Sequence, residues 1–170
     1  IRLSLVGSEM CIRDSAIALA DRKLKVVLYG NDEEVRDEIE ISHSNERYLP
    51  GVELPGNIIG STDINEAACC DVILLVVPSQ VARIVLKQLA KAQPSKHTII
   101  VSCTKGLDPE TGELMHELIH EFFPDNPVAV LSGPSHAEEV ASRMATLATI
   151  GSDDLEIASR VQQIFTLPWF

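Results

Sequence analysis

The chain has 170 residues, of which 45% are hydrophobic and 23% are charged. This length predicts one globular domain with one core, and no apolar run approaches the roughly 18 residues of a membrane span. The formal net charge of −11 argues against nucleic acid or an anionic membrane as a partner, because such partners are bound through clustered Lys and Arg.

The cysteines and the N-terminal sequence indicate the compartment. The four cysteines lie in or beside apolar segments without C-x-x-C spacing, so we expect reduced core thiols and no metal site. Glu9, Arg13 and Asp14 interrupt the sequence after the first apolar stretch, which argues against a signal peptide. We therefore expect a cytoplasmic protein.

Short segments rich in β-branched residues alternate along the chain with segments of helical periodicity. Strands are predicted at 1–6, 25–29, 57–60, 72–77, 98–103, 128–131 and 147–150. Helices are predicted at 15–23, 32–41, 79–92, 109–122, 136–142 and 153–165. This alternation predicts a Rossmann-like α/β fold, with a doubly wound, mostly parallel sheet and helices on both faces.

Two further segments have their own predicted conformations. Residues 42–56 carry neither period and contain two Pro and two Gly, which predicts a loop crossing one edge of the sheet. Residues 167–170 resemble the start of another strand and end in exposed apolar side chains. We therefore expect the chain to continue in a longer parent protein.

Two strand ends carry residues that could bind an anionic ligand, because an open parallel sheet presents its ligand sites there. The segment SCTKGL at 102–107 places Lys105 where it could either enter the crevice or remain a solvated loop residue. At 132–140, Ser135 and Glu138 have capping-box spacing, and the same helix start also suits a phosphate or a carboxylate. Both interpretations stay open for each segment.

Two other strand ends carry weaker signals. Pro78 fixes the exit of the chain from the sheet, Ser79 can cap the next helix, and a cofactor could pass over this turn. Asn31 and Asp32 follow the second strand, where dinucleotide-binding folds place the residue that meets the adenosine ribose. Asp32 could also be only an N-cap, so the choice between NAD and NADP stays open.

A possible metal pair is interpreted as structural. His116 and His120 are four residues apart and could share one helical face. No carboxylate or cysteine at suitable spacing completes a ligand set, so we interpret both as solvated helix residues.

Four motifs occur in order: RYLPG at 47–51, VVPSQ at 76–80, TKGLDPETG at 104–112 and LSGPSHAEEVA at 131–141. Together they resemble the amino-terminal domain of bacterial NAD(P)-dependent glycerol-3-phosphate dehydrogenases. The resemblance implies hydride transfer between NAD(P)H and dihydroxyacetone phosphate, which forms sn-glycerol 3-phosphate for phospholipid synthesis. It also implies small-molecule partners and a homodimer of the full-length enzyme.

The resemblance assigns roles to individual residues. In the family, the lysine that matches Lys105 contacts both cofactor and substrate, and the matches of Gly133 and Ser135 hold substrate. The cofactor-binding positions predicted for this chain are Gly7, Asn31, Asp32, Tyr48, Pro78, Lys105 and Ala137.

The phosphate loop departs from the family pattern. The family has G-x-G-x-W-G after the first strand, and here Glu9 matches the second glycine, Cys11 the tryptophan and Ile12 the third glycine. Only Gly7 is retained, so we expect impaired binding of the pyrophosphate. Residues 4–15 also resemble translated sequencing-adapter DNA, and we interpret them as an artefactual N-terminal segment.

The second departure is length, because the resemblance covers about half of a typical family member. The proton-donating lysine of the family lies in the other, mostly helical half, so we assign no catalytic residue and expect no turnover by this chain. Three alternatives stay open: a non-catalytic dinucleotide-binding module, a related hydroxyacid or ketopantoate-type dehydrogenase domain, and a structural or partner-binding α/β domain.

Overall fold

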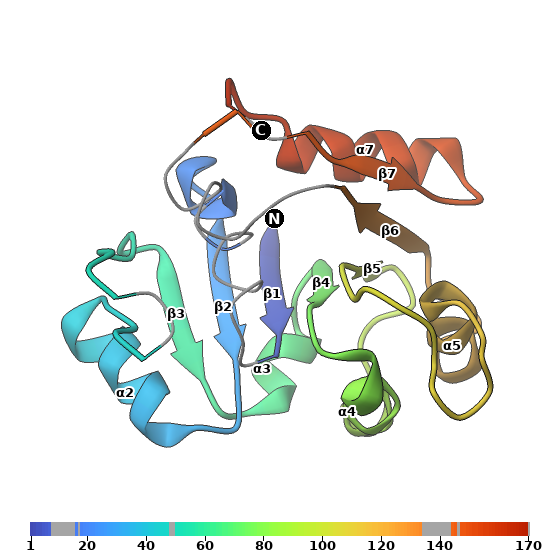
Figure 1. Cartoon of the computed structure of the whole chain (residues 1–170), viewed down its shortest axis with the longest axis horizontal. Coiled ribbons are helices and arrows are strands. Elements are labelled where there is room, and N and C mark those ends of the chain that lie inside the picture. The colour runs from blue at the N-terminus through green and yellow to red at the C-terminus, as the bar shows by residue number, and fades with distance from the viewer. Residues whose placement is uncertain (8–15, 17, 48–49, 134–143, 146, 170) are drawn as a thin grey trace.

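A computed structural model describes residues 1–7, 16, 18–47, 50–133, 144–145 and 147–169 (Figure 1). Seven strands form one sheet in the order β3-β2-β1-β4-β5-β6-β7. The strands are β1 (Arg2–Val6), β2 (Lys25–Tyr29), β3 (Ile58–Ser61), β4 (Val72–Leu75), β5 (Ile99–Ser102), β6 (Val128–Ser132) and β7 (Thr149–Gly151). All neighbouring pairs are parallel except β6 and β7, which confirms the predicted mostly parallel sheet.

The strands form where apolar side chains occupy both faces of the sheet. Every residue of β4 and β5 is buried, as expected for central strands of a parallel sheet. Successive residues point to opposite faces, so Leu74 packs in one hydrophobic core while Ile73 and Leu75 pack in the other.

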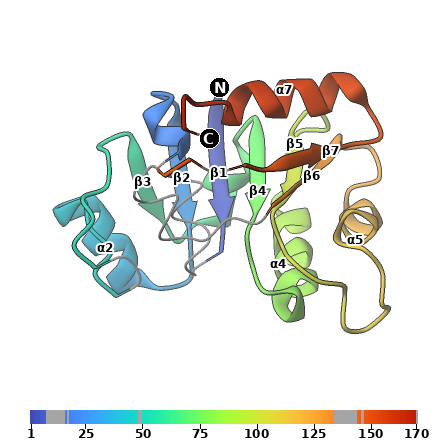
Figure 2. The ribbon, with the colours of Figure 1, turned by 45° about the horizontal axis from the view of Figure 1, so that its top comes forward.

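Helices cover both faces. The described helices are α2 (Glu33–Ser42), α3 (Ile64–Ala68), α4 (Ser79–Lys91), α5 (Met115–Phe122) and α7 (Leu155–Phe165), and residues 16 and 18–21 are also helical. The first core contains side chains from Ala16, Leu19, Ala20, α2 and α7, and the second contains side chains from α3, α4 and α5. Figure 2 shows α7 beside β6 and β7, which its contacts confirm.

Aspartate side chains begin three of these helices. Asp32, Asp63 and Asp154 are the N-caps of α2, α3 and α7, and each accepts hydrogen bonds from backbone N–H groups of the first turn. The cap at Asp63 begins α3, a short helix between β3 and β4 that the sequence analysis did not predict.

The predicted helix at 109–122 is wrong in its first half, because α5 begins only at Met115. Residues 108–113 form a turn in which Gly112 donates to the Asp108 carbonyl and Asp108 donates to the Glu113 carbonyl. Gly112 has φ +77°, a left-handed conformation that ends any helical path through it. The predicted strand at 167–170 is also wrong over residues 167–169, which are irregular and then turn.

The loop predicted at 42–56 is confirmed for the residues described beyond the end of α2. His43 ends α2 in the left-handed conformation, and its carbonyl accepts from the Leu54 N–H at 2.7 Å. Leu54 is buried in the first core, so the loop is anchored at both ends. The predicted helix at 136–142 lies outside the described residues.

Candidate functional site

The candidate site lies at the sheet edge where the carboxyl ends of the parallel strands meet. The chain runs from β1 outward to β3 and then returns to β4 on the other side of β1, so the strand order reverses between β1 and β4. Ligands of open α/β sheets bind at such a reversal. Predicted site residues follow five of these strands: Gly7 after β1, Asn31 and Asp32 after β2, Pro78 after β4, Lys105 after β5 and Gly133 after β6.

Gly7 ends β1 in a conformation that suits glycine. Its φ is +144°, which L side chains rarely adopt, and its N–H donates to the Tyr29 carbonyl at 3.1 Å. Residues 8–15 lie outside the described part of the chain. The predicted effects of Glu9, Cys11 and Ile12 on the phosphate loop therefore stay predictions.

At the end of β2, polar side chains bond to one another and to α2. Asp32 Oδ1 accepts from the Glu34 and Val35 N–H groups at 3.0 and 3.3 Å, which confirms the capping interpretation. Asp32 Oδ2 accepts from Arg47 at 2.9 Å. This ion pair brings the RYLPG segment to the end of β2, while Tyr48 of that segment lies outside the described residues.

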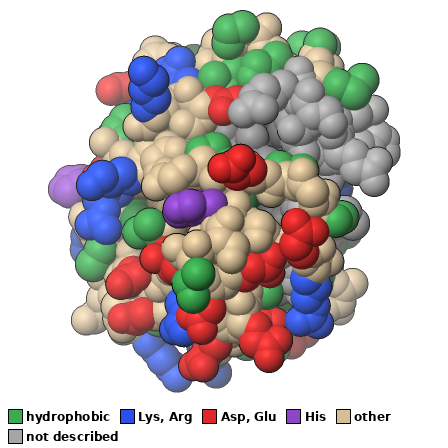
Figure 3. All heavy atoms as spheres, turned by 90° about the vertical axis from the view of Figure 1, so that its left-hand side faces the viewer, with side chains coloured by type: hydrophobic (Ala, Val, Ile, Leu, Met, Phe, Trp, Pro, Cys, Tyr) green, Lys and Arg blue, Asp and Glu red, His purple; other side chains and the backbone are tan. Residues whose placement is uncertain are grey.

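Tyr29, the last residue of β2, is an unpredicted part of the same group. Its hydroxyl donates to Asn31 Oδ1 at 3.0 Å. Burial, with the nearby negative charge of Asp63, raises the pKa of the Tyr29 phenol above its usual value. Tyr29 thus remains a neutral donor at physiological pH and orients the Asn31 amide. Figure 3 shows the side of the molecule on which α2 and β3 lie, where Asp and Glu side chains lie beside Lys and Arg side chains.

The turns after β4 and β5 lie against each other. The Thr104 hydroxyl accepts from the Val77 N–H at 3.4 Å and donates to the Leu75 carbonyl at 3.3 Å. A Cβ placed on Gly106, whose φ is +98°, would lie 3.5 Å from the Ser79 hydroxyl. Pro78 occupies the N-cap of α4, which has no side-chain cap hydrogen bond, so the expectation that Ser79 caps this helix is wrong.

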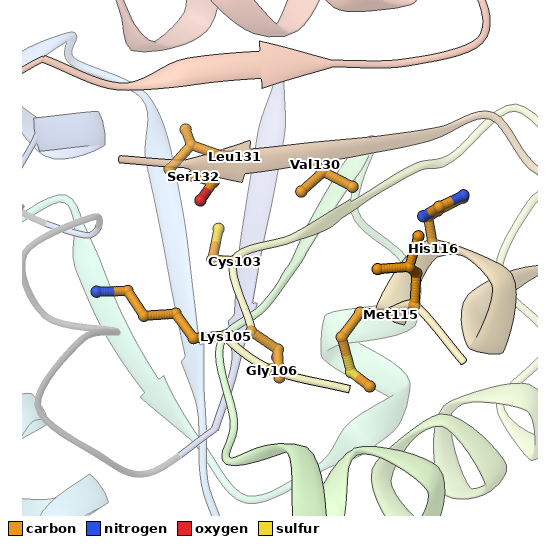
Figure 4. A pocket seen from close by; sticks show the side chains of 10 residues that line it. Cys103, Lys105, Gly106, Met115, His116, Val130, Leu131 and Ser132 are labelled. Atoms are coloured by element: carbon orange, nitrogen blue, oxygen red, sulfur yellow. The ribbon is translucent and has the colours of Figure 1, made fainter. Parts of the chain in front are cut away.

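A cavity of about 250 Å³ opens beside Lys105. It is bounded by the ends of β5 and β6 and the start of α5, and its lining residues are Cys103, Thr104, Lys105, Gly106, Leu114, Met115, His116, Val130, Leu131 and Ser132. Figure 4 shows the Lys105 side chain extending away from Met115 and His116. An exposed cation at the mouth of a cavity of this size suits a small anionic ligand.

The turn that carries Lys105 is held by a buried carboxylate. The Asp108 side chain is 1% exposed, and its Oδ2 accepts from Arg83 Nη2 at 2.7 Å and from the Thr111 hydroxyl at 2.9 Å. The hydrogen bond from Arg83 lowers the pKa of the Asp108 carboxyl, and those from Thr111 and the Glu110 backbone add to it against the effect of desolvation. The sequence analysis missed this contact, although the DPETG segment carries turn signals.

Gly133 is fixed by packing at the end of β6. A Cβ at this position would come within 2.6 Å of the Leu147 carbonyl oxygen and 3.0 Å of the Ala148 Cα, both of which precede β7. Glycine is thus required here by the returning chain, independently of any ligand. Ser135 and Ala137 lie outside the described residues, and their predicted roles are untested.

A second cavity of about 230 Å³ separates α5 from the edge of the sheet. His116 and His120 line it, together with Ser152 and Asp153, and both histidines are partly exposed. Within the described ranges, no three His, Cys, Asp or Glu side chains are grouped as metal ligands would be. The helices of the same ranges are all too short or too polar to cross a bilayer.

Comparison with known proteins gives one consistent result. A family model described as the N-terminus of NAD-dependent glycerol-3-phosphate dehydrogenase matches residues 14–158. The curated glycerol-3-phosphate dehydrogenase [NAD(P)+] of Bacillus thuringiensis (strain Al Hakam) is 39% identical over 173 residues, which cover 99% of this chain and 51% of the relative. The chain therefore spans about half the length of the curated relatives it matches.

Solved structures agree. The glycerol-3-phosphate dehydrogenase of Coxiella burnetii superposes with a TM-score of 0.92 at 27% identity, over 99% of this chain and 52% of that one. The Plasmodium falciparum enzyme gives a TM-score of 0.92 at 28% identity, over 100% and 51% of the two chains. These likenesses confirm the predicted Rossmann-like fold and the resemblance drawn from the four motifs.

Proposed function

The chain belongs to the NAD-dependent glycerol-3-phosphate dehydrogenase family, and we propose that it is the part of such an enzyme that binds NAD or NADP. The enzyme would transfer hydride between NAD(P)H and dihydroxyacetone phosphate to form sn-glycerol 3-phosphate. The observation that carries this proposal is that the predicted site residues follow the carboxyl ends of five strands, which lie along one edge of the sheet on both sides of the reversal between β1 and β4.

The residues at this edge fit a dinucleotide. Gly7 leaves the end of β1 without a side chain, where the pyrophosphate lies in this fold class. Asn31 and Asp32 offer an amide and a carboxylate to the adenosine ribose. Pro78 and Lys105 would contact the cofactor after β4 and β5, where Lys105 lines the cavity.

Lys105 supplies a positive charge to the anionic substrate and orients it beside the cofactor. When bound, the nicotinamide would supply the hydride for the carbonyl carbon of dihydroxyacetone phosphate, and the proton for the carbonyl oxygen would come from the donor lysine that the family carries in its other half. The resemblance assigns the binding of the substrate to Gly133 and Ser135 as well. No residue of this chain is assigned as the proton donor, so we expect no measurable turnover by the 170-residue chain.

The test is a fluorescence titration with NADH and NADPH. It compares this chain with a version in which Glu9→Gly and Ile12→Gly restore the glycines of the family's phosphate loop. We expect tight binding only after restoration, because a glutamate beside the pyrophosphate repels it and a branched side chain prevents close helix packing. Failure of both versions to bind, with both folded by circular dichroism, would overturn the cofactor assignment.

Three accompanying proposals concern the wider protein. Residues 1–170 are proposed to be a single domain, and segment 4–15 is proposed to be artefactual: the family match begins at residue 14, whereas the curated relative aligns over 99% of the chain and residues 4–6 lie in β1. The full-length enzyme is a cytoplasmic homodimer that acts on small molecules. Light scattering of a full-length relative carrying this domain would test the dimer, and a monomer would contradict it.

A further inference from the structure

Arg83 of α4 lies at the centre of a cluster of acidic side chains. Its two terminal nitrogens bond to different carboxylates, Nη2 to Asp108 at 2.7 Å and Nη1 to Glu121 at 2.8 Å. Its Nε lies 3.4 Å from Glu110, and its guanidinium lies 5.8 Å from the centre of the Phe122 ring. These contacts hold the planar guanidinium from several sides and leave the Arg83 side chain only 21% exposed.

The cluster joins three segments that are distant in sequence. Arg83 comes from α4, Asp108 from the turn after β5, and Glu121 from α5. Asp108 lies three residues after Lys105, and the Gly106 between them packs against Ser79 at the start of α4. The ion pair and this close packing therefore fix both sides of the turn to the same helix.

We propose that Arg83 and Asp108 are positioning residues for Lys105, an inference that rests on the proposed function of Lys105. The buried Arg83–Asp108 ion pair closes the 104–114 turn, which carries Lys105 at its start. Removing Arg83 leaves the buried Asp108 carboxylate without its counterion, and removing the Asp108 carboxylate leaves Arg83 Nη2 without its acceptor, so in either case the turn opens to hydrate the remaining group. Lys105 then loses its fixed place at the mouth of the cavity.

Amide hydrogen exchange tests the positioning directly in the 170-residue chain. In Arg83→Met and Asp108→Asn, we expect exchange of the amides of residues 108 and 112, which donate to backbone carbonyls within the turn, to rise about tenfold or more while β5 stays protected. Lys96→Met is the matched control, because Lys96 also pairs with a carboxylate, Asp125, at 2.6 Å but far from this turn. Unchanged exchange at residues 108 and 112 in both variants would overturn the proposal.

A double-mutant cycle separates positioning from general stability. In the chain with the restored glycines, Lys105→Met and Asp108→Asn should each weaken NADH binding roughly 10- to 100-fold, and the double variant should lose little more. Full additivity, or unchanged affinity in Asp108→Asn alone, would overturn the role through Lys105. If the restored parent itself binds no NADH, the proposed function fails, and the exchange result still decides whether the pair holds the turn.

Discussion

The turns after β2 and β5 use the same chemical parts in two different environments. In each turn, an aspartate accepts from an arginine and from a donor of its own turn, which is a backbone N–H group for Asp32 and the Thr111 hydroxyl for Asp108. At β2 the Asp32 and Arg47 side chains are 31% and 63% exposed, whereas at β5 the Asp108 and Arg83 side chains are 1% and 21% exposed. Solvent screens the first pair, so we expect only the second to determine the local conformation strongly.

The largest difference is expected from removing each carboxylate. Asp108→Ala leaves Arg83 partly buried beside a void and breaks the bond from Thr111. We expect its urea unfolding midpoint to fall well below that of Asp32→Ala, measured by circular dichroism under identical conditions. Equal midpoints for the two variants would contradict the contrast drawn between the turns.

Acid should reveal the same difference. The pKa of Asp108 in the folded chain lies below its ordinary value of 3.8, so its ion pair stabilises the fold above that pH. This stability should be lost as the pH falls through the lower, folded-state pKa. Unfolding midpoints between pH 6 and pH 2 should therefore decline more steeply in the parent chain than in Asp108→Asn, and parallel curves would sink this prediction.

Asp32→Ala should have a moderate effect, limited to the start of α2. Loss of an N-cap costs about 0.5 to 2 kcal/mol, because two backbone N–H groups lose their acceptor. Asp32→Ser retains a capping oxygen and is the control. Chemical denaturation should rank the serine variant between the parent and the alanine variant, and an alanine variant as stable as the parent would contradict the cap.

Arg47→Met should have the smallest effect. An exposed ion pair contributes about 0 to 1 kcal/mol, and added salt reduces it further. The unfolding midpoints of Arg47→Met and the parent should therefore differ little and converge at high salt. A loss as large as that of Asp108→Ala would show that Arg47 stabilises the fold in a way its exposure does not indicate.

The sheet was predictable because local composition determines it. Seven apolar segments sufficed for seven strands, with ends displaced by a residue or two. The wrong half of the helix at 109–122 has a long-range cause: Pro109 and Glu110 are typical of a helix start, but Asp108 is held by Arg83, 25 residues earlier. The helix α3 has only five residues, which is too few to show a helical period in the sequence, although Asp63 marks its N-cap.

The position of the candidate site could be predicted from the sequence, but the residues that hold its turns in place could not. Strand ends located Gly7, Asp32, Pro78 and Lys105 because parallel strands present their carboxyl ends at one edge. Arg83 could not be found in this way, because it lies within a helix and acts on a turn that only the folded chain brings near. In the sequence, Arg83 reads only as one of the polar residues on the solvent-facing side of α4.

The central position of β1 has a consequence for synthesis. This strand precedes both of its neighbours in the sequence, and while β2 covers one edge, the other pairs with β4, so that Arg2 meets its partner Asp71 only 69 residues later. At 5 to 20 residues per second, translation takes roughly 3 to 14 seconds to supply that partner. During this interval one edge of β1 lacks its native neighbour, so we expect the pairing of β1 with β4 to form only after residues 72–75 have been synthesised.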